Sequence, residues 1–158
     1  MFKPVCAAVV LAAAMATPAL AAGPLQVESK VLVEQKIRAA DGTVRVVLGP
    51  PRKVVPGDRV TFVLAYRNTG TQPIANIVLD NPVPKGMAYR GPAAASAAPE
   101  LSIDGKTYGA SLAALSVMNP IGTLRAATPD DVTHVRWRLA RPISPGGQGQ
   151  LAFNAILK

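Results

Sequence analysis

Short stretches in which apolar and polar residues alternate constrain the fold of this 158-residue chain more than any other feature. The clearest stretch is 59–68, where Val60, Phe62, Leu64 and Tyr66 occupy every second position. Successive side chains of a β-strand point to opposite faces, so this spacing predicts a strand with one apolar face. A helix would instead repeat its apolar residues every three to four positions.

Proline and glycine separate further stretches of this kind along the chain. Asp41-Gly42 predicts a hairpin turn between runs at 25–37 and 43–48. The first run has the even spacing of a half-buried strand, with Val27, Val31, Val33 and Ile37 as its apolar positions. Additional strands are expected at 74–80, 87–90, 101–103, 134–139 and 150–157.

Two segments lack the alternation. The Ala- and Pro-rich stretch 91–99 is interpreted as a surface loop, and 110–118 is compatible with either one helical turn or a strand. Thr128 with Pro129 behind it predicts the start of a short helix. Seven to nine short strands and hardly any helix predict an all-β protein, a sandwich of two packed antiparallel sheets.

The first 21 residues have the composition of a secretory leader. Lys3 gives a positive start, an apolar stretch follows, and Ala19 and Ala21 supply the small residues of a cleavage site. About 12 apolar residues would cover only ~18 Å as a helix, whereas a hydrocarbon core is ~30 Å thick. We therefore expect a cleaved signal peptide at 1–21, one exported domain at 22–158, and no membrane span after cleavage.

The residue inventory argues against several kinds of site. The only cysteine, Cys6, lies in the predicted leader, and His134 is the only histidine, so an intramolecular zinc site or a Cys–His pair is not expected. The soft copper ligands Met87 and Met118 are far apart in sequence and are interpreted as core residues. No calcium loop, phosphate-binding glycine loop or nucleophile elbow is present. The sequence predicts no catalytic residues, no metal and no cofactor.

The formal net charge of +8 would become +7 on loss of Lys3. For an exported protein this excess indicates anionic envelope surfaces such as lipopolysaccharide, lipid head groups or glycans, and not nucleic acid. The candidate binding row is formed by His134, Arg136 and Arg138, with Arg141 close behind. The alternative interpretation is a solvated or edge-protecting face. Trp137 lies on the opposite face with Val135 and Leu139 and is expected in the core.

The stretch 55–70, Val-Pro-Gly-Asp-Arg-Val-Thr-Phe-Val-Leu-Ala-Tyr-Arg-Asn-Thr-Gly, resembles the signature of the bacterial conserved-repeat family called domain of unknown function eleven. Matching positions continue at Ala75, Asn76, Ile77, Asp80, Pro84, Gly86, Tyr89, Trp137, Leu139 and 144–147. The resemblance covers 54–158 and is closest to single-copy exported members. It implies an immunoglobulin-like sandwich without enzymatic activity. Phe62 replaces the usual tyrosine, and there is no second repeat or sorting tail, so the role of a surface stalk is not implied.

The motif residues also have a direct physical interpretation. Pro56 and Gly57 suit a turn that leads into the strand at 59–68, and the Asp58 carboxylate can accept backbone N–H bonds in it. Asn68 and Asn76 lie where strands end or begin, and their amides can bond backbone groups that the sheet leaves open. These positions are expected to be structural.

Together these observations predict a non-catalytic, exported module of the cell envelope with an interaction or structural role. Its partner would be an envelope protein or an anionic surface. Two alternatives stay open, a periplasmic carrier or chaperone that pairs a client strand with a sheet edge, and a binder of anionic envelope surfaces. Edge pairing requires a flat outer strand without inward charges or bulges.

Overall fold

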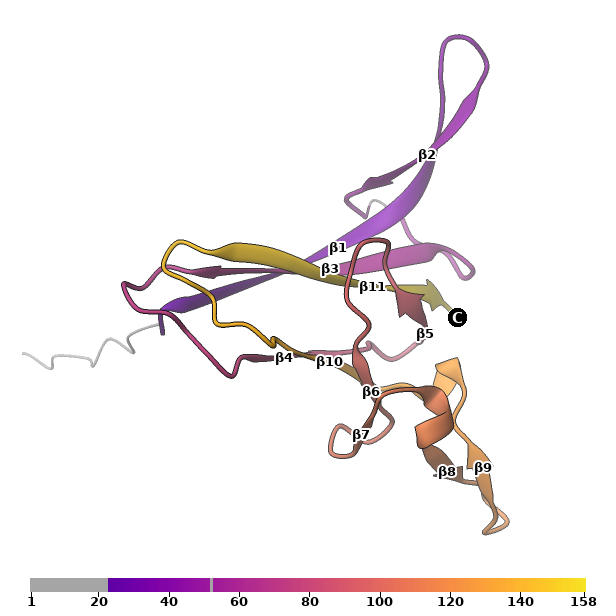
Figure 1. Ribbon diagram of the computed structural model, residues 1–158. Helices are drawn as coiled ribbons and strands as arrows, with labels where there is room; N and C mark the ends of the chain where they lie inside the picture. The colour runs from indigo at the N-terminus through magenta and orange to yellow at the C-terminus, as the bar shows by residue number, and fades with distance from the viewer. Residues whose placement is uncertain (1–22, 52) are drawn as a thin grey trace, which may run out of the picture.

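The computed structural model describes residues 23–51 and 53–158, and the predicted signal peptide lies outside them (Figure 1). The described chain contains eleven strands and two single turns of 3-10 helix. The elements are β1 Leu25–Arg38, β2 Val44–Gly49, β3 Arg59–Asn68, β4 Val78–Pro82, β5 Met87–Pro92, β6 Glu100–Ser102, β7 Tyr108–Gly109, η1 Leu112–Ala114, β8 Ser116–Met118, β9 Leu124–Ala126, η2 Pro129–Asp131, β10 His134–Arg138 and β11 Gln148–Leu157.

The strands form two main antiparallel sheets, in the orders β2-β1-β3-β11-β5 and β4-β10-β6-β7. The connections β3–β4, β4–β5, β5–β6 and β10–β11 each cross from one sheet to the other, which brings distant parts of the sequence together. The all-β sandwich predicted from the sequence is confirmed. The strand number exceeds the expected seven to nine because β7, β8 and β9 have only two or three residues each.

The core lies between the two sheets and is built from the alternating apolar positions. Phe153 of β11 is fully buried, and its ring stacks on Phe62 of β3 with centroids 4.9 Å apart. Trp137 approaches Phe153 from the opposite sheet at 6.3 Å, and its indole N–H donates to the carbonyl of Ala97 at 2.9 Å. The prediction that Trp137 is a core residue is therefore confirmed.

The motif residues occupy the turns that frame β3. Gly57 has φ 95°, and the Asp58 carboxylate accepts the backbone N–H of Val55 at 2.8 Å, as the turn chemistry predicts. The buried Asn68 side chain bonds three backbone groups, which confirms its structural role. Asn76 is explained by its backbone conformation and not by bonds from its amide. Its φ of 55° lies in the left-handed region, which asparagine tolerates better than most residues.

The segment without alternation combines both of the conformations considered for it. Residues 112–114 form the 3-10 turn η1, and β8 follows directly. Thr128 begins η2 as predicted, because the Thr128 hydroxyl and backbone N–H both bond the carboxylate of Asp131 in a capping box. Of the expected loop 91–99, the first two residues extend β5.

The first hairpin departs from the expected burial. Val33 is buried, but Val27, Val31 and Ile37 are 48%, 37% and 51% exposed. The length of the neighbouring strand explains the exposure of Ile37, because β3 pairs with β1 only from Leu25 to Val33. Val27 and Val31 are exposed although they pair with Tyr66 and Phe62 of β3. Beyond Val33 the chain continues as a two-stranded ribbon that projects from the sandwich (Figure 1). We call residues 34–49 the β1–β2 arm.

Candidate interaction surface

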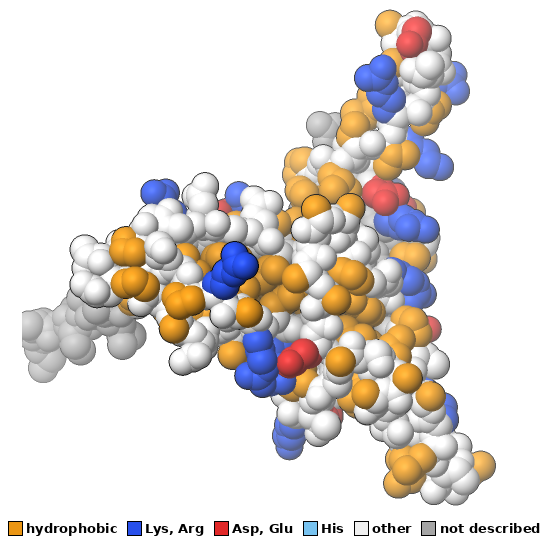
Figure 2. All heavy atoms as spheres, in the orientation of Figure 1, with side chains coloured by type: hydrophobic (Ala, Val, Ile, Leu, Met, Phe, Trp, Pro, Cys, Tyr) orange, Lys and Arg blue, Asp and Glu red, His pale blue; other side chains and the backbone are white. Residues whose placement is uncertain are grey.

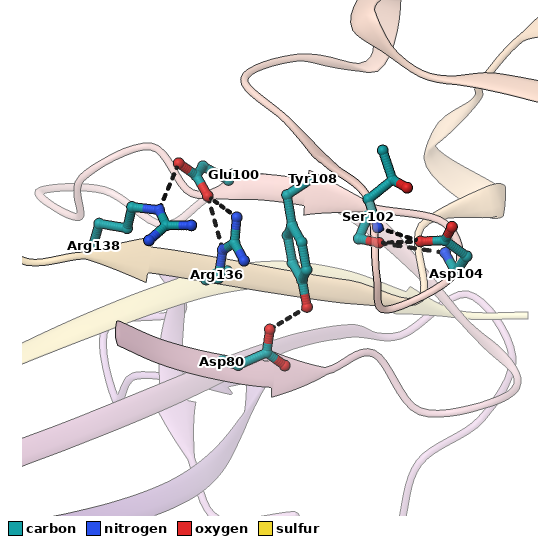
Figure 3. Close-up of polar contacts among 8 residues, drawn as sticks. Asp80, Glu100, Ser102, Asp104, Tyr108, Arg136 and Arg138 are labelled. Carbon is teal, nitrogen blue, oxygen red and sulfur yellow. Dashed lines mark hydrogen bonds and ion pairs between the residues drawn. The ribbon is translucent and has the colours of Figure 1, made fainter. Parts of the chain in front are cut away.

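The basic row predicted from the sequence lies on the outer face of the second sheet, where it meets acidic residues. Arg136 of β10 is opposite Asp80 of β4 on one side and Glu100 of β6 on the other. Its Nε and Nη2 atoms donate to one oxygen of Glu100 at 2.8 and 2.6 Å (Figure 3). The register of three strands therefore places the arginine between two carboxylates.

Tyr108 of β7 completes this arrangement. Its ring lies under the Arg136 guanidinium, with 3.6 Å between Cζ and the ring centroid, and its hydroxyl donates to the Asp80 carboxylate. Burial, and then the Asp80 carboxylate, raise the pKa of Tyr108 to about 12. The hydroxyl therefore stays protonated and donates its hydrogen bond throughout the physiological pH range.

Arg138 is the second cation of the row, and its Nε donates to the other Glu100 oxygen at 3.3 Å. We call Asp80, Glu100, Tyr108, Arg136 and Arg138 the polar cluster. Two carboxylates face two guanidinium groups, so the cluster carries no net charge. Both arginines of the hypothetical anion-binding row thus have an intramolecular partner, and an external anion would compete with Glu100 for them.

Among the described contacts, neither of the other two residues of that row bonds a residue of the cluster. His134 contacts the turn at 104–105, where a Cβ on Gly105 would lie 2.9 Å from its imidazole, and its Nδ1 is 3.0 Å from the Thr133 hydroxyl. Arg141 follows β10 in the exposed connection to β11. The structure therefore brings Arg136 and Arg138 together but adds neither His134 nor Arg141 to them.

Acidic pH should weaken the polar cluster. Hydrogen bonds from Arg136, together with the charges of both arginines, lower the pKa of Glu100, so its ion pairs stabilise the fold above the ordinary value of 4.5 and are lost as pH falls through the lowered value. We expect Glu100→Gln to reduce the free energy of unfolding by about 0.5–1 kcal/mol at pH 7, since the pair is partly exposed. The difference should shrink toward pH 2 in urea denaturation.

Glu28→Gln is the matched control, because the ion pair described for Glu28 is with Lys30 at 3.3 Å and both side chains are well exposed. This variant should remain close to the parent at both pH values. Equal losses for the two variants at pH 7, or a Glu100→Gln difference that grows as the pH falls, would contradict the ion-pair interpretation.

The potential metal ligands are dispersed. Met87 packs against the core as expected, but the prediction for Met118 is wrong, since this side chain is 63% exposed at the end of β8. Within residues 23–51 and 53–158, no three His, Cys, Asp or Glu side chains are grouped closely enough to hold a metal ion.

Two projecting hairpins carry eight of the twelve large apolar side chains that are exposed in the described residues (Figure 2). In the β1–β2 arm, Val44, Val46 and Leu48 are 55%, 57% and 51% exposed. The second hairpin, residues 116–126, is the β8–β9 arm, and its exposed apolar residues are Met118, Ile121 and Leu124. Isolated exposed apolar residues are ordinary, whereas clusters on projecting elements are typical of interaction sites.

The two arms share one turn geometry. Gly42 and Gly122 both have φ 82°, and their N–H groups donate to the carbonyls of Ala39 and Asn119 at 3.0 Å. At the base of the β8–β9 arm, Arg125 forms a bidentate ion pair with Asp131 at 2.6 and 2.7 Å. This ion pair lowers the pKa of Asp131 well below its usual range. The arms are therefore defined structures and not irregular loops.

Sequence reasoning did not identify Glu100, Tyr108 or the exposed arms. Glu100 and Tyr108 carry no motif, and only the pairing of β6 with β7 and β10 brings them to Arg136. The short apolar runs of the arms look like any buried strand, although Asp41-Gly42 had indicated that the first arm is a hairpin.

Neither described helical turn, at three residues each, has the length or the hydropathy needed to cross a bilayer. No family model, curated protein or solved structure matches this chain. The resemblance to the conserved-repeat family therefore depends on the motif residues themselves.

Proposed function

We propose that this protein is a non-catalytic, exported module of the bacterial cell envelope, with residues 22–158 acting as one domain that binds another envelope protein or holds it in place. The observation that carries the proposal is the pair of arms that keep large apolar side chains in solvent. A signal peptide at 1–21 and the motif resemblance over 54–158 support export and membership of the conserved-repeat family.

The polar groups of the described residues support a non-catalytic role. The carboxylates of Glu100 and Asp131 are engaged by arginine, and Asp104 accepts the N–H groups of Lys106 and Thr107 at 2.8 Å. These backbone bonds lower the pKa of Asp104 to about 2. Carboxylates whose pKa is lowered in this way stay ionised at neutral pH and suit a structural role, whereas a general acid or base needs a pKa near the working pH.

A carrier or chaperone that pairs a client strand with a sheet edge is the second candidate. It is favoured by β2, the outer strand of the five-stranded sheet, which pairs with β1 without a register shift and contains no proline. A binder of anionic surfaces has less support, because Arg136 and Arg138 already share Glu100.

The β8–β9 arm offers a direct test. Tagged protein, exported with its own leader, is expected to retain one envelope protein in stoichiometric amount from an envelope extract. Ile121 is 84% exposed, so Ile121→Glu should leave the fold intact and reduce retention at least tenfold. Val55→Glu, which adds the same charge at another exposed apolar side chain, is the control and should bind normally.

Three results would contradict the proposal. They are retention of no protein, equal retention by the Ile121→Glu variant, and retention by anionic vesicles alone. The last result would instead favour a surface binder, particularly if Arg136→Glu abolished it.

A further inference from the structure

Within residues 23–51 and 53–158, the backbone groups along the outer edge of β2 have no strand partner. The Ala39 N–H donates to the Thr43 carbonyl at 2.8 Å, which makes these residues a hydrogen-bonded pair at the end of the ladder. Hydrogen-bonded and non-bonded pairs alternate along an antiparallel ladder. With Arg38 opposite Val44 and Lys36 opposite Val46, this alternation turns the N–H and C=O groups of Val44, Val46 and Leu48 away from β1.

The other outer strands of the two main sheets carry features that discourage pairing. β5 ends in Pro92 and has a register shift against β11. β4 contains Asp80 and Pro82, and β7 is only two residues long. Proline, bulges, charges and short length are the usual protection of sheet edges. β2 has six residues, no proline and no register shift, and Arg45 is its one charged residue.

The β1–β2 arm also lacks a third strand. Beyond Val33 the only pairing described is between β1 and β2. A two-stranded ribbon is marginally stable in water, and a third or fourth strand adds both hydrogen bonds and apolar contacts. Val44, Val46 and Leu48 direct their backbone groups outward and also expose their side chains. An added strand would therefore supply hydrogen bonds to the backbone groups and apolar contacts to the side chains.

We infer that β2 pairs antiparallel with β2 of a second copy of this chain, about a two-fold axis through Val46. Outward-facing residues can pair only with outward-facing residues. Val46 then lies opposite its own counterpart, Val44 lies opposite Leu48 of the second copy, and Arg45 lies opposite Val47. The two arms become a four-stranded sheet joined by three hydrogen-bonded pairs.

The register with its axis at Val46 suits the side chains better than the registers with the axis one residue away, at Arg45 or Val47. An axis through Arg45 would set two arginines directly opposite each other, and like charges in that position are destabilising. An axis through Val47 would leave only two hydrogen-bonded pairs within the strand. With the axis at Val46, every outward-facing residue meets an apolar residue, and the strand is complementary to itself, as a two-fold interface requires.

Charge is compatible with self-association at the arm. The arm contains the basic residues Lys36, Arg38 and Arg45 and the acidic residues Glu34 and Asp41, a net of +1, whereas the whole chain carries +8. Lys36 and Arg38 share the face of Val44 and Val46 but lie on β1. One strand therefore separates them from β2 of the second copy, and two strands separate them from Lys36 of the second copy.

The inference goes beyond the proposed function, since it assigns a dimer to one arm and leaves the β8–β9 arm free for the envelope partner. Experiments can therefore distinguish a failure of the proposed dimer from a failure of the proposed envelope-protein binding. A monomer that still captures its envelope partner would overturn only the dimer, and a dimer that captures nothing would overturn only the proposed function.

Val46→Pro is the first test. Proline removes the outward N–H of residue 46 but no bond to β1, and edge strands accept it at such positions. In analytical ultracentrifugation, the parent is expected to show a concentration-dependent dimer, and Val46→Pro should weaken dimerisation at least tenfold with an unchanged circular dichroism spectrum. A monomeric parent, or a folded Val46→Pro variant that dimerises equally well, would overturn the inference.

Cysteine crosslinking tests the register in a Cys6→Ser background. A bonded antiparallel pair has its Cα atoms about 5.5 Å apart, within the 4.4–6.8 Å that a disulfide spans. Val46→Cys should crosslink to itself under mild oxidation, and Val44→Cys should crosslink to Leu48→Cys when the two are mixed. Ile121→Cys, at a more exposed site, is the collision control. Equal crosslinking of this control, or none at Val46→Cys, would overturn the inference.

Discussion

Replacing Phe153 with alanine is expected to lower the free energy of unfolding by about 3–5 kcal/mol. The ring is fully buried and contacts aromatic side chains from both sheets, with Phe62 stacked at 4.9 Å, Tyr89 at 6.0 Å and Trp137 at 6.3 Å. Its removal opens a cavity at the centre of the sandwich, where the rigid strands cannot close in. Urea denaturation followed by tryptophan fluorescence measures the loss.

Phe153→Leu serves as the graded control. Leucine retains most of the apolar volume but loses the aromatic contacts, so the expected loss is about 1–2 kcal/mol. A loss below 1 kcal/mol for Phe153→Ala would mean that the two sheets do not pack through this ring.

Asn68→Ala should have the second largest effect, a loss of about 2–4 kcal/mol. The Asn68 side chain is fully buried, and its Nδ2 donates to the carbonyls of Gln72 and Ile143, both at 2.8 Å, while its Oδ1 accepts the Gly70 N–H at 2.9 Å. Alanine removes all three bonds; the Ile143 carbonyl still accepts the Ile74 N–H at 3.0 Å, but the Gln72 carbonyl and the Gly70 N–H lose the partner described for them, and unpaired buried polar groups are costly. The same urea measurement applies.

Thr69→Ala is the matched control at the neighbouring position. The Thr69 hydroxyl donates to the Pro24 carbonyl at 3.0 Å but is exposed, so water can replace the bond and the loss should stay below about 1 kcal/mol. Equal losses for Asn68→Ala and Thr69→Ala would contradict the role assigned to the buried amide.

The motif that resembles the conserved-repeat family therefore has a structural explanation in this chain. Gly57 supplies a positive φ at the entrance to β3, Asp58 closes the turn, and Asn68 joins the end of β3 to the connections before β4 and β11. These residues fix how the sheets are joined. The sequence analysis anticipated this structural role.

The faces of the core strands could be predicted from the sequence because burial there follows a period of two. Val60, Phe62 and Leu64 point inward, as do Leu151 and Phe153, as their alternation indicated. The same period failed to predict burial in the β1–β2 arm. Whether an alternating strand is buried depends on the length of its neighbour, and one sequence does not reveal that β3 pairs with β1 only as far as Val33.

The polar cluster shows a second limit of sequence reasoning. Alternation correctly placed Arg136 and Arg138 on the face opposite Trp137. The partners of Arg136 come from segments 28 to 56 residues earlier in the chain, at Tyr108, Glu100 and Asp80. Which strands flank β10 follows from the sheet topology, which local pattern does not encode.

Amide hydrogen exchange along β2 tests most directly whether this edge is an open pairing site. At low protein concentration, the amides of Val44, Val46 and Leu48 should exchange rapidly, while those of Arg45 and Val47, bonded to β1, should exchange slowly. As the concentration rises, the first three should become protected while Ile121 in the β8–β9 arm remains unchanged. Uniform protection at the lowest concentration, or no added protection at the highest, would contradict the account.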